Sequence, residues 1–204
     1  GKWHLGTLDP DHSGKPNRDP AANYAPPWER DYDESFATEY AVPTWDPGRH
    51  FTDKTYERGD SPWQSPYYEN GVKVDEMLLG CDSKLIADRT IAFLRSAVGE
   101  KKPFFSTIWF HAPHAPVEAG PEYLRMYKDH DIDEAHYYGV VTAMDEQVGR
   151  ILTALDDLAV TDDTVVWFCS DNGPEGSEDL GTNGRYRGVT GGLRGRKRSL
   201  YNGG

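Results

Sequence analysis

Between residues 83 and 168 the sequence twice shows apolar residues at helical spacing followed by a short continuous apolar run. Residues 83–98 carry apolar side chains at helical spacing, with Asp82 or Ser83 available as the N-cap. Residues 104–110 form an apolar run between turn formers, which predicts a buried strand. Residues 136–158 predict a second amphipathic helix, and residues 165–168 a second buried strand. This alternation favours an α/β fold with a mostly parallel sheet flanked by helices.

The first 70 residues follow neither a helical nor a strand period for long. They hold nine of the chain's 14 prolines, together with Trp3, Trp28, Trp45 and Trp63. Because proline fixes φ and removes a backbone donor, we predict an irregular segment over residues 7–75. A loop this long is usually functional, although its aromatic side chains would equally serve to anchor it to a core. Residues 76–176 then form the α/β core, and residues 177–204 a Gly/Arg-rich loop segment.

Composition excludes several classes of protein. The 204 residues carry a formal net charge of −12, and a net acidic surface repels nucleic acid. No apolar stretch approaches the roughly 20 residues that a membrane helix needs, so a membrane span is excluded. Two cysteines are too few for a disulfide scaffold or a four-cysteine zinc site. The chain begins at Gly1 without a methionine or a signal-like segment, and we expect an internal piece of a longer protein.

Polar residues follow both predicted strands. The first strand runs into residues 111–116, which include His111 and His114, and the second runs into Asp171 and Asn172. Ligands of open α/β sheets bind beyond the carboxyl ends of the strands. Carboxylate and amide oxygens are donors that Ca²⁺ or Mg²⁺ prefers. Taken alone, Asp-Asn-Gly is also a common turn, and two histidines in a loop often only satisfy local hydrogen bonds.

A dense run of positive charge lies near the end of the chain. Six basic residues and no acidic residue lie between 185 and 198: Arg185, Arg187, Arg194, Arg196, Lys197 and Arg198. At the other end Lys2 and His4 alternate with Trp3, so in an extended segment they share one side. Cations close to a divalent metal and neutral histidines suit a small tetrahedral ester anion. A solvated basic tail is the alternative interpretation.

Together these segments resemble the sulfatase family of the alkaline-phosphatase-like superfamily. The matching motifs are Gly1-Lys2-Trp3-His4-Leu5-Gly6, Phe110-His111-Ala112-Pro113-His114-Ala115-Pro116, the helix from His136 to Arg150, Ser170-Asp171-Asn172-Gly173, and Gly192 to Gly204. They follow the family's order and span nearly the whole chain. The resemblance implies an alkaline-phosphatase-like fold of which residues 1–204 are part of one catalytic domain. Residues 38–47 further resemble bacterial members thought to act on sulfated polysaccharides.

The resemblance implies four catalytic residues. Lys2 would contact the sulfate oxygens and the nucleophile, and His4 would hydrogen-bond the nucleophile. His114 would help to protonate the leaving alcohol, a task that suits an imidazole. Lys197 would neutralise a second sulfate oxygen. Lys2, His114 and Lys197 would therefore also bind substrate.

The resemblance likewise implies a metal site, in which Asp171 and Asn172 would be ligands. The expected ion is Ca²⁺, with Mg²⁺ as the alternative, and it would polarise the sulfate. The sequence departs from the family at Arg196 and Arg198, where glycine is usual, which questions the conformation of the loop around Lys197.

The family's nucleophile is a formylglycine made from Cys or Ser in a Cys/Ser-x-Pro/Ala-x-Arg motif. Neither Cys81 nor Cys169 stands in that motif, so we expect the nucleophile upstream of Gly1 and no turnover by these residues alone. Family habit implies a periplasmic or secreted enzyme. Two alternatives stay open: a phosphate or phosphonate ester hydrolase of the same superfamily, and a relative that binds anionic glycans without cleaving them.

The expected substrate is a sulfated glycan or an aryl sulfate ester. Aromatic faces stack well on pyranose rings, and the irregular segment supplies candidates in Trp28, Tyr40, Trp45, Trp63 and Tyr67. We predict that residues 7–75 form a wall of the substrate cleft and that Trp45 binds substrate.

Overall fold

A computed structural model describes residues 1–13, 18–48, 65–176, 185 and 187–204. The candidate Trp63 and part of the 177–204 segment lie outside these ranges. The α-helices are α1 (Asp82–Gly99), α2 (Pro121–Met126) and α3 (Ile132–Asp157). Three 3₁₀ turns are η1 (Ala21–Asn23), η2 (Pro27–Glu29) and η4 (Thr161–Asp163). The strands are β1 (Phe36–Ala37), β2 (Tyr68–Glu69) and β3 (Val72–Lys73).

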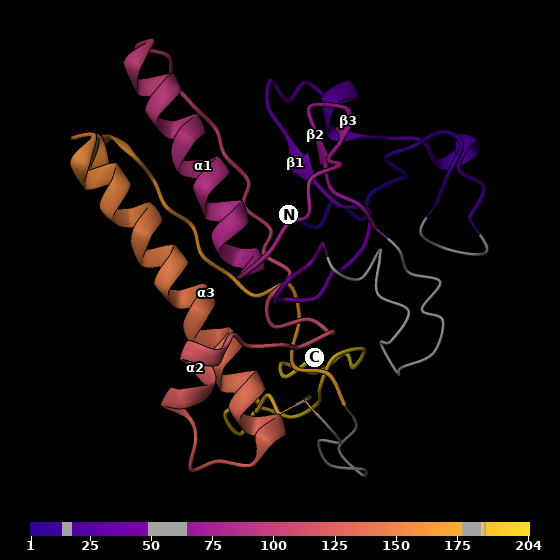
Figure 1. The fold of residues 1–204 in the computed structure, drawn as a ribbon, viewed down its shortest axis with the longest axis vertical. Coiled ribbons are helices and arrows are strands. Elements are labelled where there is room, and N and C mark those ends of the chain that lie inside the picture. The colour runs from indigo at the N-terminus through magenta and orange to yellow at the C-terminus, as the bar shows by residue number, and fades with distance from the viewer. Residues whose placement is uncertain (14–17, 49–64, 177–184, 186) are drawn as a thin grey trace.

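The two long helices lie side by side and form the centre of the packing (Figure 1). Their shared core consists of Ala87, Ile91 and Leu94 from α1 with Ile151, Ala154 and Leu155 from α3. These residues recur at the three- and four-residue spacing of one helix face, which confirms both helices predicted from periodicity. The N-cap of α1 is Cys81 rather than the predicted Asp82 or Ser83, because both of these side chains are buried in the first turn.

The helix α3 begins four residues before its predicted start. The Asp131 side chain caps it by accepting a hydrogen bond from the Asp133 amide at 3.0 Å. The short helix α2 packs on the first half of α3, and Gly139 lies at the contact. A methyl group on Gly139 would stand 2.7 Å from the Ala119 Cβ, so only glycine lets the two helices approach this closely.

The described residues between 7 and 75 form mostly turns around a small antiparallel sheet of order β1-β2-β3. Asn70 and Gly71 join β2 to β3, and both have the positive φ that a tight hairpin turn requires. The aromatic residues of this segment serve largely as anchors. Trp3 and Tyr68 are buried in one cluster, with Trp28 packed against them. The interpretation of the aromatics as anchors to a core therefore holds for these side chains.

The prediction of two buried strands is wrong for the described residues. Among the described residues, 104–110 and 165–168 join no sheet, and Figure 1 shows both as coil beside the helices. Phe105 is 78% exposed, Val165 92% and Trp167 85%. Residues 104–110 keep a strand's alternation: Phe104, Ile108 and Phe110 pack on the α1–α3 core, whereas the odd-numbered side chains face outward. Burial of both faces would need neighbouring strands and a second covering layer, which the described residues do not supply.

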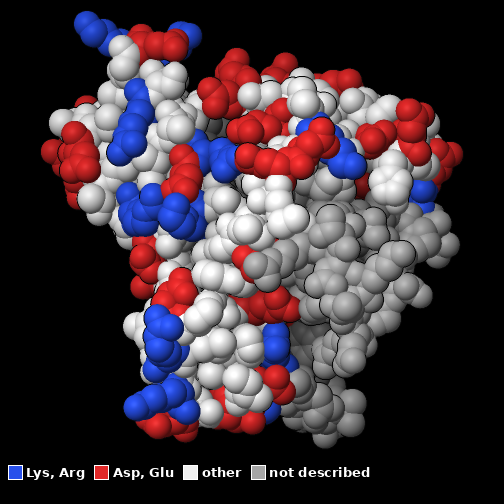
Figure 2. All heavy atoms as spheres, in the orientation of Figure 1, with Lys and Arg blue, Asp and Glu red and all other residues white. Residues whose placement is uncertain are grey.

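Positive and negative side chains are interspersed along the helices on the face that Figure 2 shows. Several form ion pairs, such as Lys84 with Asp88 at 2.6 Å and Arg150 with Asp88 at 2.7 Å. Exposed pairs of this kind contribute little stability each. None of the helices described here has the length and the apolar character needed to cross a bilayer.

The two glycines inside α3 give a matched test of this packing. We expect Gly139→Ala to lower the free energy of unfolding by about 1–3 kcal/mol, because the added methyl collides with Ala119 and Tyr123. Gly149→Ala should raise it by about 0.5–1 kcal/mol, because nothing lies within 4 Å of that site and alanine favours the helix. Urea unfolding of both variants measures the difference. Equal effects of the two substitutions would contradict the close approach of α2 to α3.

Candidate active site

Lys2 is held between two distant segments. Its amide donates to the Trp109 carbonyl at 3.1 Å, and it pairs with Thr38 in an isolated parallel bridge. The flanking bonds run from the Trp3 amide to the Thr38 carbonyl at 2.8 Å and from the Thr38 amide to the Gly1 carbonyl at 3.0 Å. Residues 1–3 thus form a short extended strand between residues 38 and 109, and Lys2 and Trp3 point to opposite sides of it.

His4 stands where this extended strand ends. Its φ is 54°, a left-handed conformation, although its amide still donates to the Glu39 carbonyl at 3.2 Å. The exposed ring lies edge-on to Tyr40, with 4.9 Å between the ring centroids. We predicted a common side for Lys2 and His4 from the alternation of side chains in an extended segment. The left-handed conformation of His4 interrupts that alternation. The role of His4 at the nucleophile stays a prediction.

His114 lies in the turn that follows residues 104–110. Its amide donates to the His111 carbonyl at 2.7 Å, and its Nδ1 lies 2.7 Å from the Ala115 carbonyl oxygen. A carbonyl only accepts, so Nδ1 carries a hydrogen. This contact orients the ring and leaves Nε2 as the nitrogen that can gain or lose a proton.

The loop with Asp171 and the loop with Lys197 are tied together. The Lys197 amide donates to the Pro174 carbonyl at 3.0 Å, and the Gly173 amide donates to the Gly204 carbonyl at 3.1 Å. The Lys197 ammonium lies 3.9 Å from a Glu175 carboxylate oxygen. These two bonds bring Lys197 and Gly204 next to the segment that follows Asp171 and Asn172.

The two arginines that replace the family's glycines stabilise this linkage. The Arg196 guanidinium donates to the carbonyls of Glu175 and Gly188, each at 2.7 Å. Arg198 forms an ion pair with Glu175, and its hydrogen bond lowers the pKa of that carboxyl despite partial burial. Both arginines therefore fix the conformation of the loop around Lys197.

Electrostatic interactions link residues from the two ends of the chain. Partial burial lowers the pKa of Lys2, the positive charge of Lys197 lowers it further, and Asp171 acts in the opposite direction. Partial burial also lowers the pKa of His114; the Ala115 carbonyl opposes that shift, whereas the charges of Lys2 and Lys197 add to it. Lys2, His114, Asp171 and Lys197 thus share one electrostatic environment, although they come from four separate segments.

Asp171 and Asn172 offer oxygen donors of the kind that Ca²⁺ prefers. Asp171 is exposed, and Asn172 uses its Nδ2 to donate to the Gly173 carbonyl at 3.0 Å, which leaves Oδ1 available as a donor to a cation. In the part of the chain that the structure describes, no group of three or more His, Cys, Asp or Glu side chains forms a metal centre. The pair fits a calcium site in chemistry and supplies part of its usual six to eight ligands.

Trp45 packs at the edge of the core instead of standing free in a cleft. Its ring lies over Gly120, where a Cβ would stand 2.3 Å from the ring atoms, and contacts a cluster that includes Ala119 and Tyr123. The ring is partly buried, and its stacking on a sugar stays a prediction. Tyr67 is different: it is buried and stacks on Phe36 at 4.1 Å, so its proposed contact with substrate is wrong.

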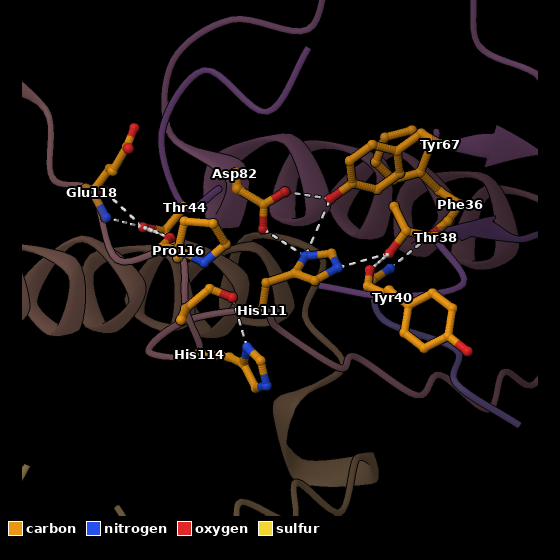
Figure 3. A network of polar contacts seen from close by, with 12 residues as sticks. Phe36, Thr38, Tyr40, Thr44, Tyr67, Asp82, His111, His114, Pro116 and Glu118 are labelled. Atoms are coloured by element: carbon orange, nitrogen blue, oxygen red, sulfur yellow. Dashed lines mark hydrogen bonds and ion pairs between the residues drawn. The ribbon is translucent and has the colours of Figure 1, made fainter. Parts of the chain in front are cut away.

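A buried polar network lies beside the site (Figure 3). His111 places Nδ1 2.8 Å from an Asp82 carboxylate oxygen and Nε2 2.8 Å from the Thr38 hydroxyl. The Tyr67 hydroxyl donates to the other Asp82 oxygen. Burial raises the pKa of Tyr67, and the charge of Asp82 raises it further, so the phenol stays protonated as a donor. Asp82, His111 and Thr38 are almost inaccessible to solvent.

Sequence reasoning missed this network. His111 was noted only as one of two loop histidines, and Asp82 only as a candidate cap. The available signal was an acid at the buried start of α1, together with a histidine three residues before His114. Nothing in the spacing of residues 38, 67, 82 and 111 shows that they meet, because each lies on a different segment.

Comparison with known structures defines the class of protein. The chain superposes along its full length on 41% of the crystal structure of Ps i-CgsB in complex with k-i-k-neocarrahexaose, with a TM-score of 0.71 and 25% identity. This places it in the α/β class with the alkaline-phosphatase-like fold predicted above. The Sulfatase family model matches residues 1–203, and the chain belongs to the sulfatase family.

Several curated proteins are similar to this chain. An uncharacterized sulfatase, YdeN, of Escherichia coli is 27% identical over 92% of this chain and 32% of its own length. The N-acetylgalactosamine-6-sulfatase of Canis lupus familiaris is 28% identical over 85% of this chain and 29% of its own length. The chain therefore spans about a third of the length of these relatives.

The shared electrostatic environment predicts how His114 titrates. We expect the pKa of His114 to lie below the ordinary value for histidine and to rise in Lys2→Met, because that change removes a nearby positive charge. Lys84→Met is the control, since Lys84 is exposed on α1 and pairs with Asp88. Histidine ring signals followed by NMR across pH measure both effects. An unchanged His114 titration in Lys2→Met would show that the two side chains do not interact.

Proposed function

We propose that this chain is part of a sulfate ester hydrolase that acts on a sulfated glycan and also accepts small aryl sulfate esters. The observation that supports the proposal is electrostatic: the charges of Lys197 and Asp171 act on Lys2, and those of Lys2 and Lys197 act on His114. A lysine whose pKa is lowered by the charge of a second lysine is a costly arrangement unless an anion binds between the two. Membership of the sulfatase family makes a sulfate ester the anion of choice.

Lys2 and Lys197 would hold the sulfate oxygens. Each comes from a backbone held by hydrogen bonds: Lys2 lies between residues 38 and 109, and the Lys197 amide donates to Pro174. Preorganised cations of this kind stabilise the charge that builds up in the transition state, because they need no reorganisation at the moment of reaction. His4, at the end of the same strand as Lys2, would hydrogen-bond the nucleophile.

His114 would protonate the leaving alcohol through Nε2. Partial burial holds the pKa of His114 below the ordinary value and the neighbouring lysines lower it further, so the free site favours the neutral ring near pH 7. A bound sulfate ester is an anion, and its charge counteracts that of the lysines. The imidazolium therefore becomes more favourable when substrate is present, which is when a general acid is needed.

The groups that complete the reaction are not side chains of the described residues. Cys81 is buried, which raises the pKa of its thiol, and neither Cys81 nor Cys169 stands in a formylglycine motif. We propose a formylglycine elsewhere in the protein as the nucleophile, so these 204 residues alone would have no turnover. Asp171 and Asn172 would hold Ca²⁺, with Mg²⁺ as the alternative, and the bound ion would polarise the sulfate.

A glycan substrate is supported by the similar proteins. One structure holds a neocarrahexaose, and several relatives are N-acetylgalactosamine-6-sulfatases. Residues 7–75 would form a wall of the cleft, with Trp45 at its edge, and residues 177–204 would form the loop that carries Lys197. An extracellular polymer as substrate implies a periplasmic or secreted protein.

A phosphate or phosphonate ester hydrolase is the second candidate, favoured by 25% identity to the multifunctional alkaline phosphatase superfamily protein PehA of Trinickia caryophylli over 46% of this chain. Turnover of nitrophenyl sulfate and nitrophenyl phosphate by the whole protein separates the two. We expect the sulfate ester to be the better substrate, because a singly charged ester suits two lysines and one metal ion. Faster turnover of the phosphate would favour the second candidate.

The role of His114 predicts a dependence on the leaving group. His114→Ala should lower the turnover of an alkyl or sugar sulfate by about 10²- to 10⁴-fold. It should lower that of nitrophenyl sulfate much less, because nitrophenolate leaves without a proton. His130→Ala, an exposed histidine between α2 and α3, is the control. Equal losses on both substrates would assign His114 to binding rather than to proton transfer.

A further inference from the structure

His111 is buried and contacts three segments, two through its ring and one through its backbone carbonyl. Its Nε2 contacts Thr38, whose backbone binds Gly1 and Trp3 on either side of Lys2. Its Nδ1 contacts Asp82 in the first turn of α1. Its carbonyl accepts from the His114 amide at 2.7 Å. Figure 3 shows His111 at the centre of these contacts, with His114 on the same loop.

The hydrogen bonds show which nitrogens carry hydrogen. The Thr38 hydroxyl donates to the Tyr40 carbonyl at 2.5 Å, which uses its one hydrogen. The Nε2 of His111, 2.8 Å from the same hydroxyl oxygen, must then be the donor in that contact. Nδ1 faces a carboxylate that can only accept from it. Both ring nitrogens are therefore engaged in hydrogen bonds, Nδ1 with Asp82 and Nε2 with Thr38.

Both oxygens of the buried Asp82 carboxylate have a donor. Asp82 accepts from His111 with one oxygen and from Tyr67 with the other, and both donors are buried. A buried charge costs desolvation, and it is stable only when hydrogen bonds satisfy its polar atoms. An apolar cluster of similar volume would hold the segments together without that cost. Hydrogen bonds differ from apolar contacts in being directional, so this network sets the position of Thr38 relative to the loop of His114.

We propose that His111 is a positioning residue of the active site, which holds Lys2 through Thr38 and His114 through its own backbone carbonyl. The inference rests on the proposed function for its catalytic consequence, because Lys2 and His114 are the residues that touch the ester there. His111 itself touches neither the ester nor the nucleophile. Its effect is to fix the distance between a sulfate-binding cation and the general acid.

Two buried threonines give a matched test. Thr38 and Thr44 are both buried, and each hydroxyl joins residues 38–44 to the loop after residue 110. The Thr44 hydroxyl bonds to the Glu118 backbone at 2.7 Å and lies 3.4 Å from the Pro116 carbonyl oxygen, whereas Figure 3 shows the Thr38 hydroxyl at the His111 ring. Replacing either threonine by valine removes a buried hydrogen bond and keeps the shape, so both variants should lose similar stability.

The catalytic effects of the two variants should differ. We expect Thr38→Val and His111→Leu to lower the kcat of the whole protein on a sulfate ester by about 10- to 100-fold, with KM changed by less than about threefold, because misplacement by an ångström costs this much. Thr44→Val should keep kcat within about twofold of the unmodified protein. If kcat per folded molecule is the same in Thr38→Val and Thr44→Val, His111 has only a structural role and the proposal fails.

Replacing His111 by glutamine or asparagine distinguishes the contact of Nε2 with Thr38 from the contact of Nδ1 with Asp82. In His111→Gln the side-chain amide can take the place of Nε2 and donate to Thr38, whereas in His111→Asn it takes the place of Nδ1 and donates to Asp82. We expect glutamine to recover more of the lost kcat than asparagine, because the contact with Thr38 is the one that leads to Lys2. A greater recovery with asparagine would contradict this route. Thr38→Ser, which keeps the hydroxyl, should retain kcat and covers the case in which Thr38→Val does not fold.

A second readout does not depend on turnover. Hydrogen exchange of the Trp3, Thr38 and His114 amides should accelerate in His111→Leu and stay unchanged in Thr44→Val, because these amides form the bonds that His111 is proposed to hold. If the unmodified protein hydrolyses no sulfate ester but the exchange changes as expected, the proposed function fails and the positioning by His111 stands. Unchanged exchange in His111→Leu would overturn the positioning itself.

Discussion

The candidate site depends on one short ladder of backbone hydrogen bonds, by which residues 1–3 lie between residue 38 on one side and residue 109 on the other. Each residue of an extended strand contributes its donor and acceptor in the plane of the ladder, so its side chains must point out of that plane. Trp3 goes to the buried side, where it packs with Leu8 and Tyr68. Lys2 is therefore directed to the other side, toward Lys197 and Asp171. The large apolar neighbour fixes the orientation of the lysine.

The sequence predicted those parts of the structure that depend on local periodicity or on residues in fixed order. The helices α1 and α3 follow from apolar spacing, because one face of each must be buried against the other. The meeting of Lys2, His114, Asp171 and Lys197 was expected from motifs in family order, and the structure brings them into one electrostatic environment. Their catalytic and metal-binding roles stay predictions.

Other features depend on contacts between segments far apart in sequence, and these were missed or wrong. Residues 104–110 have strand alternation, yet burial of the odd-numbered face requires a neighbouring layer that composition does not reveal. Tyr67 was placed in the cleft because tyrosine suits a sugar, but its hydroxyl binds Asp82 inside the protein. Arg196 and Arg198 looked like a disturbance of the Lys197 loop. The structure shows that their guanidinium groups bind Glu175 and Gly188 and so tie this loop to the segment that follows Asp171 and Asn172.

The balance of charge around the site explains why the segments that carry it must be held in place by other interactions. Lys2 and Lys197 repel each other, and Asp171 offsets only part of that repulsion. Left to flexible loops, the two ammonium groups would move apart into water, because separation lowers their electrostatic energy. Backbone bonds to Thr38, Trp109 and Pro174 oppose this movement, and a positioned His111 keeps the Thr38 side of the strand in place. A site that binds an anion between cations must be held together by interactions other than the charges themselves, and here those interactions come from the extended strand and the Asp82–His111 pair.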